Sequence, residues 1–245
     1  MSLTDTSALV TGAANRLGAQ IARTLHQNGA NLIIHYRESE SAASALVQEL
    51  NQAREDSAVA IAADLARDDD IERLADQACS SFGGLQLLVN NASSFYPTRF
   101  GEIERKDWDD LIASNYRAPL FLSQACHPAL SKCRGSIVNM VDIYASRPLA
   151  RHSVYCSAKA ANAMLVKSLA LELAPEVRVN GIAPGAILWP ENADQDDAQR
   201  SRKLESIPLK RLGGPTVIAD TVLFLATNDY ITGEIVRVDG GSMLC

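Results

Sequence analysis

The feature that most constrains this chain is the alternation of short, β-branched apolar runs with longer segments of helical period. Such alternation is typical of a parallel sheet whose strands are joined by crossover helices. Strands of this kind are buried on both faces, so they read as continuous apolar runs and not as alternating ones. The predicted fold class is therefore α/β, with a doubly wound parallel sheet and helices on both faces.

The elements follow one another without a break that would mark a domain boundary. We expect strands at Ser7–Thr11, Asn31–Tyr36, Ala58–Ala62, Leu85–Asn90, Ser136–Val141, Arg178–Ile182 and Val236–Val238. We expect helices at Arg16–Gln27, Ser41–Ala53, Asp69–Ser80, Asp107–Ala129, Ser153–Leu173 and Thr216–Ala226. No repeat, low-complexity segment or linker rich in Pro, Gly or Ser interrupts them, so residues 1–245 are predicted to form a single domain.

Charge, hydropathy and cysteine usage exclude several classes of protein. A net charge of -6 and a pI near 5.3 argue against nucleic acid or an anionic membrane as a partner. The apolar runs are too short to span a bilayer, and no signal peptide precedes the first strand. The five cysteines form no CxxC and no His/Cys ligand set, which suits a reducing cytosol and no metal site. We therefore expect a cytoplasmic protein without a metal.

A glycine turn follows the first strand and opens the first helix. In the segment Thr11-Gly-Ala-Ala-Asn-Arg-Leu-Gly18, Gly12 permits a tight turn and Gly18 lets helix and strand approach closely. The N–H groups at such a helix N-terminus can face a pyrophosphate. A glycine turn alone can be only a tight loop, but the strand–turn–helix context indicates a Rossmann-type dinucleotide site.

The ends of the second and third strands carry the residues expected to choose the cofactor. Arg37 and Ser39 suit the 2′-phosphate of NADPH, whereas an NAD site usually has a carboxylate there. Glu38 is an awkward neighbour, and a solvated Arg37–Glu38 loop is the alternative. Asp64 can accept from the adenine amino group, cap the next helix, or do both.

Tyr155 and Lys159 are four residues apart in a helical segment and therefore share one face. A tyrosine with a pKa near 10 is a weak acid–base catalyst at neutral pH. A nearby ammonium stabilises the phenolate and lowers that pKa. Tyr and Lys at this spacing occur by chance in many helices, and the pair alone would favour two surface residues.

With these residues the chain resembles the short-chain dehydrogenase/reductase family from the glycine turn to Val238-Asp-Gly-Gly241. The supporting motifs are Asn90-Asn-Ala92, Asn115, Tyr155 with Lys159, Arg178-Val-Asn180 and Pro184-Gly185. The resemblance implies that Asn115 holds a water linking Lys159 to solvent, and that Lys159 bonds the nicotinamide ribose. It also implies that Pro184 to Ile187 border the nicotinamide, and that the protein is a homotetramer with the Ser153–Leu173 helix at an interface.

Three departures from the family pattern are informative. Most of the family has Gly where Arg16 and Ser93 stand, and a catalytic Ser where Asp142 stands. All three changes are shared with the pteridine reductases, which this chain resembles at the glycine turn, His35-Tyr36, Asn91–Pro97 and Asn139–Asp142. It is similar also to bacterial dihydromonapterin reductases, at Ala174–Val177 and Ile182–Leu188.

The pteridine reductase resemblance implies a substrate site. Phe95 would stack on the pterin ring against the nicotinamide, while Ser93 and Arg16 would bond pterin and cofactor phosphate. A serine suits a carbonyl oxygen that becomes an alkoxide, because it is a neutral donor. The Asp142 carboxylate would repel an oxyanion but can pair with a Tyr hydroxyl or with ring N–H groups. The alternatives are Asp142 as a strand-end cap and Phe95 as a core residue.

Two further expectations concern the remainder of the chain. The polar, acid-rich Glu191–Arg202 segment is either a surface excursion or part of a substrate-side flap near 188–210. Of the histidines, only His35 has a candidate role, beside the adenosine phosphate. His26, His127 and His152 are read as surface or packing residues, and Cys156 is given no catalytic role.

These observations predict NADPH-dependent reduction of a pterin by hydride transfer to a ring C=N bond. The alternatives are a carbonyl reductase of the same fold and a non-enzymatic NADPH-sensing protein. The predicted catalytic residues are Asp142, Tyr155, Lys159 and Asn115. The predicted substrate-binding residues are Arg16, Ser93, Phe95, Asp142 and Tyr155. The predicted cofactor-binding residues are Gly12, Asn15, Arg16, Leu17, Gly18, His35, Tyr36, Arg37, Ser39, Asp64, Leu65, Asn91, Ala92, Ser93, Tyr155, Lys159, Pro184, Gly185 and Ile187.

Overall fold

The computed structural model describes residues 3–189 and 197–244. Its seven strands form one parallel sheet in the order β3-β2-β1-β4-β5-β6-β7. The strands are β1 (Ser7–Val10), β2 (Asn31–Tyr36), β3 (Ala58–Ala62), β4 (Leu87–Asn90), β5 (Ser136–Met140), β6 (Arg178–Pro184) and β7 (Ile235–Val238). The order reverses between β1 and β4, which is where open α/β sheets bind their ligands. The prediction of a single-domain, Rossmann-type α/β fold is confirmed.

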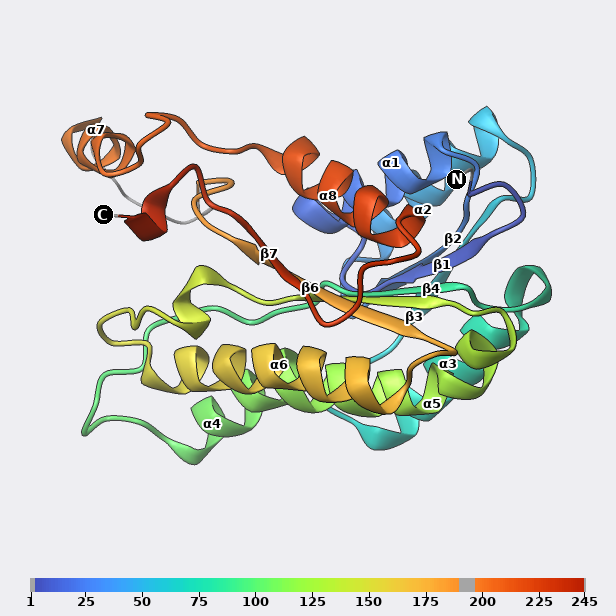
Figure 1. The fold of residues 1–245 in the computed structure, drawn as a ribbon, viewed down its shortest axis with the longest axis horizontal. Helices are drawn as coiled ribbons and strands as arrows, with labels where there is room; N and C mark the ends of the chain where they lie inside the picture. Colours follow the sequence, from blue (N-terminus) through green and yellow to red (C-terminus); the bar gives the residue numbers. More distant parts are fainter. Residues whose placement is uncertain (1–2, 190–196, 245) are drawn as a thin grey trace.

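Helices cover both faces of this sheet (Figure 1). One layer consists of α1 (Arg16–Gln27), α2 (Glu40–Ala53) and α8 (Pro215–Thr227). The other consists of α3 (Asp68–Ser80), α4 (Arg105–Ile112), α5 (Ala118–Lys132) and α6 (Ser153–Glu172).

Each layer has its own apolar core against the sheet. In β1, Ala8 and Val10 belong to the core under α1 and α8, whereas Leu9 belongs to the core under α3 and α5. All three side chains have no exposed surface. This two-sided burial is why the strand reads as an unbroken apolar run.

The expected elements agree with the structure to within two residues at most ends. The ranges of β2, β3 and α1 are those the sequence predicts, whereas β4 begins at Leu87 instead of Leu85. The edge strand β3 differs from the inner ones, because its Val59 and Ala60 are exposed.

The single helix expected at Asp107–Ala129 is wrong. The structure has α4, then a π-helical turn at Ala113–Arg117, then α5. Inside the wide turn, side chains satisfy carbonyls of the preceding turn: Asn115 Nδ2 donates to Leu111 O at 3.0 Å and Ser114 Oγ donates to Asp110 O at 3.0 Å. A π turn adds one residue to an otherwise continuous helical period, so the apolar spacing did not reveal it.

The segment predicted as a flap contains the short helix α7 (Asp197–Glu205), which has no buried residue. In Figure 1 it lies beyond the sheet, near the C-terminal end of the chain. Residues 190–196 of the expected excursion lie outside the described residues. Closure of this segment over a ligand stays a prediction. Within the described part of the chain, no helix is both long and apolar enough to cross a membrane.

Candidate active site

A cavity of about 410 Å³ lies at the carboxyl ends of β1, β2, β3 and β4. Twelve of the residues predicted to bind the cofactor line it: Gly12, Asn15, Arg16, Leu17, Gly18, His35, Arg37, Asp64, Leu65, Asn91, Ala92 and Ser93. Tyr36 and Ser39 do not line the cavity. Tyr36 packs half-buried against the core, and Ser39 is exposed at the N-cap of α2.

The glycine turn leaves no room for side chains where the chain doubles back. Gly12 has a φ of +61°, a conformation that residues with a Cβ rarely adopt. A Cβ on Gly18 would lie 2.3 Å from the Gly12 carbonyl oxygen. The cradle is therefore backbone brought close to backbone, which is the geometry a dinucleotide pyrophosphate requires.

Thr11 ties this turn to the end of β4. Its Oγ1 accepts the N–H groups of Asn91 and Ala92, both at 2.9 Å, and Asn91 Nδ2 donates to Thr11 O at 2.8 Å. Sequence reasoning missed Thr11, although a hydroxyl at the last position before the turn was the available signal.

His35 supports the same turn from β2. Its Nδ1 accepts the Gly12 N–H at 3.0 Å, and its Nε2 donates to Ala63 O at 3.1 Å. Burial lowers the pKa of His35 to about 4, so the imidazole is neutral at physiological pH. His35 thus lines the cavity as predicted, but its contribution is to hold backbone and not to bring positive charge to a phosphate.

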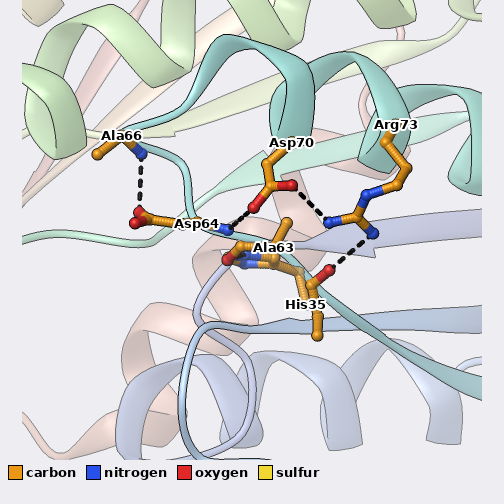
Figure 2. A network of polar contacts seen from close by, with 7 residues as sticks. His35, Ala63, Asp64, Ala66, Asp70 and Arg73 are labelled. Carbon is orange, nitrogen blue, oxygen red and sulfur yellow. Dashed lines mark hydrogen bonds and ion pairs between the residues drawn. The ribbon is translucent and has the colours of Figure 1, made fainter.

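A polar network surrounds Asp64 where β3 ends (Figure 2). Asp64 Oδ1 accepts the Ala66 N–H at 3.0 Å, while its own N–H donates to Asp70 Oδ2 at 2.8 Å. Arg73 binds the other oxygen of Asp70 at 2.8 Å and holds the pKa of that carboxyl below its usual range. The helix-cap interpretation of Asp64 is wrong, because the N-cap of α3 is Arg67 and Asp64 caps the preceding turn. Asp64 still borders the cavity.

Both interpretations of Arg37 have support. Its Nε lies 3.3 Å from Glu38 Oε1, and the two side chains are 56% and 81% exposed, so this ion pair contributes little to stability. Arg37 also lines the cavity, where its guanidinium is available to a ligand.

A second cavity, of about 350 Å³, adjoins the first and shares Arg16, Leu17, Asn91 and Ser93 with it. The remaining predicted residues gather here: Phe95, Asp142, Tyr155, Lys159, Pro184, Gly185 and Ile187. The structure therefore brings the expected catalytic and substrate-side residues together, except Asn115, which lies behind them.

Asp142 and Tyr155 form a direct pair. Tyr155 Oη donates to Asp142 Oδ2 at 2.7 Å, and the Tyr144 N–H donates to Asp142 Oδ1 at 2.8 Å. Asp142 is also the N-cap of the short 3-10 turn Ile143–Ala145, so the capping interpretation is confirmed, and the catalytic role of Asp142 stays a prediction compatible with it. Burial raises the pKa of Asp142. Burial and the neighbouring carboxylate raise the pKa of Tyr155, so the expectation that Lys159 lowers it is wrong.

Lys159 is engaged elsewhere. Its Nζ donates to Met140 O at 2.8 Å and lies 5.7 Å from the centre of the Tyr155 ring. Burial lowers the pKa of Lys159 to about 8. Lys159 is 2% exposed, so it borders the cavity as a buried cation.

Asn115 is the end of a chain of buried amides. Each amide donates to the next oxygen: Asn90 Nδ2 to Asn139 Oδ1 at 2.8 Å, Asn139 Nδ2 to Asn162 Oδ1 at 3.0 Å, and Asn162 Nδ2 to Asn115 O at 2.9 Å. The Asn115 side chain accepts from Ser93 Oγ at 2.8 Å. The chain joins β4, β5 and α6 to the π turn. The sequence motifs included Asn90 and Asn139, but only Asn115 was given a role and Asn162 was missed.

Phe95 projects into the second cavity with 51% of its surface exposed, so the core interpretation is wrong. Its ring stacks on His152 at a centroid distance of 4.8 Å and meets Tyr155 edge-on, also at 4.8 Å. His152 was predicted to be a surface or packing residue, and the packing interpretation is confirmed because it is buried against Phe95. The sequence signal that could have placed it beside the site was its position at the start of the helix that carries Tyr155.

Comparison with known proteins identifies the family of this chain. The family model described as enoyl-(acyl carrier protein) reductase matches residues 12–243. The 3-oxoacyl-(acyl-carrier-protein) reductase of Staphylococcus epidermidis is 35% identical, over 96% of this chain and 98% of its own. Pteridine reductase 1 of Leishmania tarentolae is 36% identical, over 97% of this chain and 96% of its own.

The chain belongs to the short-chain dehydrogenase/reductase family. It is therefore an oxidoreductase that uses a nicotinamide cofactor. Among solved structures, a blue fluorescent protein from a metagenomic library, in complex with NADPH, aligns with a TM-score of 0.92 and 32% identity over 99% of both chains.

One departure from the common pattern of this family has a structural explanation. Arg16 has a φ of +51°, a conformation that suits the glycine usual at this position. The Arg16 side chain, which a glycine would lack, donates from its guanidinium to Trp189 O at 2.9 Å. Arg16 thus connects the glycine turn with the chain that follows β6, and it borders both cavities.

Proposed function

We propose that this reductase transfers a hydride from NADPH to a ring C=N bond of a pterin, converting a dihydropterin to a tetrahydropterin. The observation that carries the proposal is the 2.7 Å hydrogen bond from Tyr155 Oη to the Asp142 carboxylate. At the position of Asp142 most of the family has a serine, which would donate to a carbonyl oxygen. A carboxylate cannot donate unless protonated, but it can accept from a hydroxyl or a ring N–H.

NADPH, when bound, supplies the hydride. The backbone cradle of Gly12 and Gly18 would hold its pyrophosphate, and Asp64 would accept from the adenine amino group. Arg37 would pair with the 2′-phosphate, because a guanidinium forms strong charge-assisted hydrogen bonds with phosphate oxygens. Because the Arg37 side chain is exposed, pairing it with a phosphate would carry only a small desolvation penalty.

The chain's own acid–base residues manage the proton. The raised pKa keeps Tyr155 neutral but makes it a weaker acid. Its hydroxyl would therefore give up the proton as hydride addition to the ring carbon makes the adjacent nitrogen basic. The raised pKa of Asp142 makes this carboxyl a group that can exchange a proton with Tyr155. Lys159, a buried cation near both, would bond the nicotinamide ribose and stabilise the negative charge left on the pair.

Positioning of the substrate would come from the opposite side of the cavity. Phe95 would stack on the pterin, and Ser93 and Arg16, which border both cavities, would contact the substrate and the cofactor phosphate. Holding a flat ring against the nicotinamide lowers the barrier by orientation, and such effects reach several kcal/mol.

Reduction of a 3-oxoacyl thioester is the competing function, since a 3-oxoacyl reductase is as similar to this chain as a pteridine reductase is. The decisive experiment is steady-state NADPH oxidation with dihydrobiopterin, dihydromonapterin, biopterin and dihydrofolate, beside an acetoacetyl thioester. We expect the highest kcat/KM with a dihydropterin. A higher value with the thioester contradicts the proposal, and no turnover of any of them would favour an NADPH-binding sensor.

We also propose that the protein is a homotetramer with α6 at an interface. Met164 and Leu171 of α6 are 60% and 83% exposed, and Phe121 of α5 is 42% exposed. Large apolar side chains on adjacent helices are typical of a buried subunit contact. Sedimentation velocity tests this, with a tetramer as the expected species and a monomer as the contradicting one.

A further inference from the structure

We propose that His152 is a positioning residue for planar substrates, because it forms the rigid backing on which Phe95 is held. This inference rests on the proposed pterin reduction and adds a residue with no previous role in it. The ring of Phe95 lies over that of His152 with an angle of 15° between their planes and 4.8 Å between their centres. His152 is 8% exposed, whereas Phe95 is 51% exposed.

The two aromatic contacts of Phe95 leave about half of its surface open. His152 stacks on Phe95, Tyr155 meets the ring in a T-shaped contact at 77°, and 51% of the Phe95 surface is still exposed. Phe95 lines the cavity that also holds Asp142, Tyr155 and Lys159. A flat ring entering this cavity would therefore complete a three-layer stack of substrate, Phe95 and His152.

Hydrogen bonds to the backbone hold the His152 ring and join the segments that carry His152 and Phe95. Its Nδ1 donates to Ala150 O at 2.8 Å, which sets the plane of the imidazole. The segment that carries Phe95 is joined to the one that carries His152, because the Thr98 N–H donates to Arg151 O at 2.6 Å and Thr98 forms a parallel bridge with His152. These contacts fix the His152 ring and join the two backbone segments that carry the stacked rings.

With this arrangement, His152 would affect the affinity for planar substrates in particular. A planar heterocycle gains affinity from Phe95 only if that ring is already held in the stacking plane, since otherwise binding must order it. A flexible acyl thioester makes no such demand on the plane of Phe95. His152 should therefore contribute to the affinity for pterins and not to NADPH binding or to the chemical step.

A matched pair of substitutions separates the ring from its hydrogen bond. His152→Gln keeps a donor for Ala150 O but removes the aromatic face, whereas His152→Phe keeps the face but removes the donor. For His152→Gln we expect the KM for dihydrobiopterin to rise about 2- to 12-fold, the range of an aromatic pair, with kcat and the KM for NADPH unchanged. For His152→Phe we expect a pterin KM close to that of the wild type.

Thermal unfolding of both variants, with His127→Gln as the control for loss of a histidine elsewhere, shows whether the fold is retained. Titration of biopterin in the presence of NADP⁺ gives the same affinity without turnover. An unchanged pterin KM in a folded His152→Gln variant overturns the role of His152, as does a KM for His152→Phe as high as that of His152→Gln. A wild type that neither binds nor reduces pterins overturns the proposed function, and this inference with it.

Discussion

The cavity beside the glycine turn and the cavity beside Tyr155 adjoin, but different parts of the chain shape them. The first depends on backbone: Gly12 and Gly18 approach each other, and Thr11 and His35 bind main-chain groups. The second depends on side chains, chiefly Phe95, Asp142 and Tyr155, which contact one another.

This difference explains how one family serves different substrates. In the backbone cradle, a side chain at Gly12 would be strained and one at Gly18 would clash with the Gly12 carbonyl, so these two positions tolerate little change. Side chains on the substrate side can change while the strands beneath them stay in place. A pteridine reductase and a 3-oxoacyl reductase can therefore both be about one-third identical to this chain.

The largest effect should come from the side-chain cavity. Tyr155→Phe removes only the hydroxyl that donates to Asp142 at 2.7 Å. We expect kcat to fall about 10²- to 10⁴-fold, the usual contribution of a general acid, while NADPH binding is retained. Stopped-flow hydride transfer and NADPH fluorescence titration measure the two quantities. A Tyr155→Phe variant with most of its pterin turnover would show that the proton comes from another group.

At the cavity beside the glycine turn, the expected effect is a loss of protein stability at low pH, caused by His35. The pKa of His35 is about 4 in the folded protein and near 6.5 in the unfolded chain. As the pH falls, His35 is therefore protonated in the unfolded chain before it is protonated in the folded protein. The free energy of unfolding should fall by roughly 3 kcal/mol between pH 6.5 and pH 4.

Urea unfolding at several pH values between 7 and 4.5 measures this loss. A His35→Gln variant should be less stable at pH 7 but should lose less stability on acidification, whereas His127→Gln should behave like the wild type. Equal pH dependence in wild type and His35→Gln would mean that other groups cause the acid sensitivity.

A smaller effect is expected at Arg37, which borders the cofactor cavity. Arg37→Asp should lower the preference for NADPH over NADH by about 1.5–3 kcal/mol, because it replaces a charge-assisted contact with repulsion. The ratio of kcat/KM for the two cofactors gives this value directly. Glu38→Gln is the matched control, since it removes the partner of Arg37 at 3.3 Å and should leave NADPH preferred. A wild type without a preference between the cofactors would exclude the role of Arg37.

Sequence reasoning was more complete for the backbone cavity than for the side-chain cavity. The glycine turn and the strand ends follow from chain geometry, so twelve of the predicted cofactor residues line one cavity. The π turn, the inner amides Asn139 and Asn162, and the His152 stack depend on contacts between segments far apart in the chain. Such contacts produce no local periodicity in the sequence. Residues of this kind can still be found where they depart from the family pattern, as Asp142 was.

The most direct test of the central claim is the kcat/KM for dihydropterin reduction by the Asp142→Ser variant, relative to the wild type. If Asp142 serves reduction of a C=N bond through Tyr155, this value should fall clearly, and activity toward an acetoacetyl thioester should rise because a neutral donor is restored. Undiminished pterin reduction by a correctly folded Asp142→Ser variant would contradict the account, because the pairing of Asp142 with Tyr155 would then have no part in the choice of substrate.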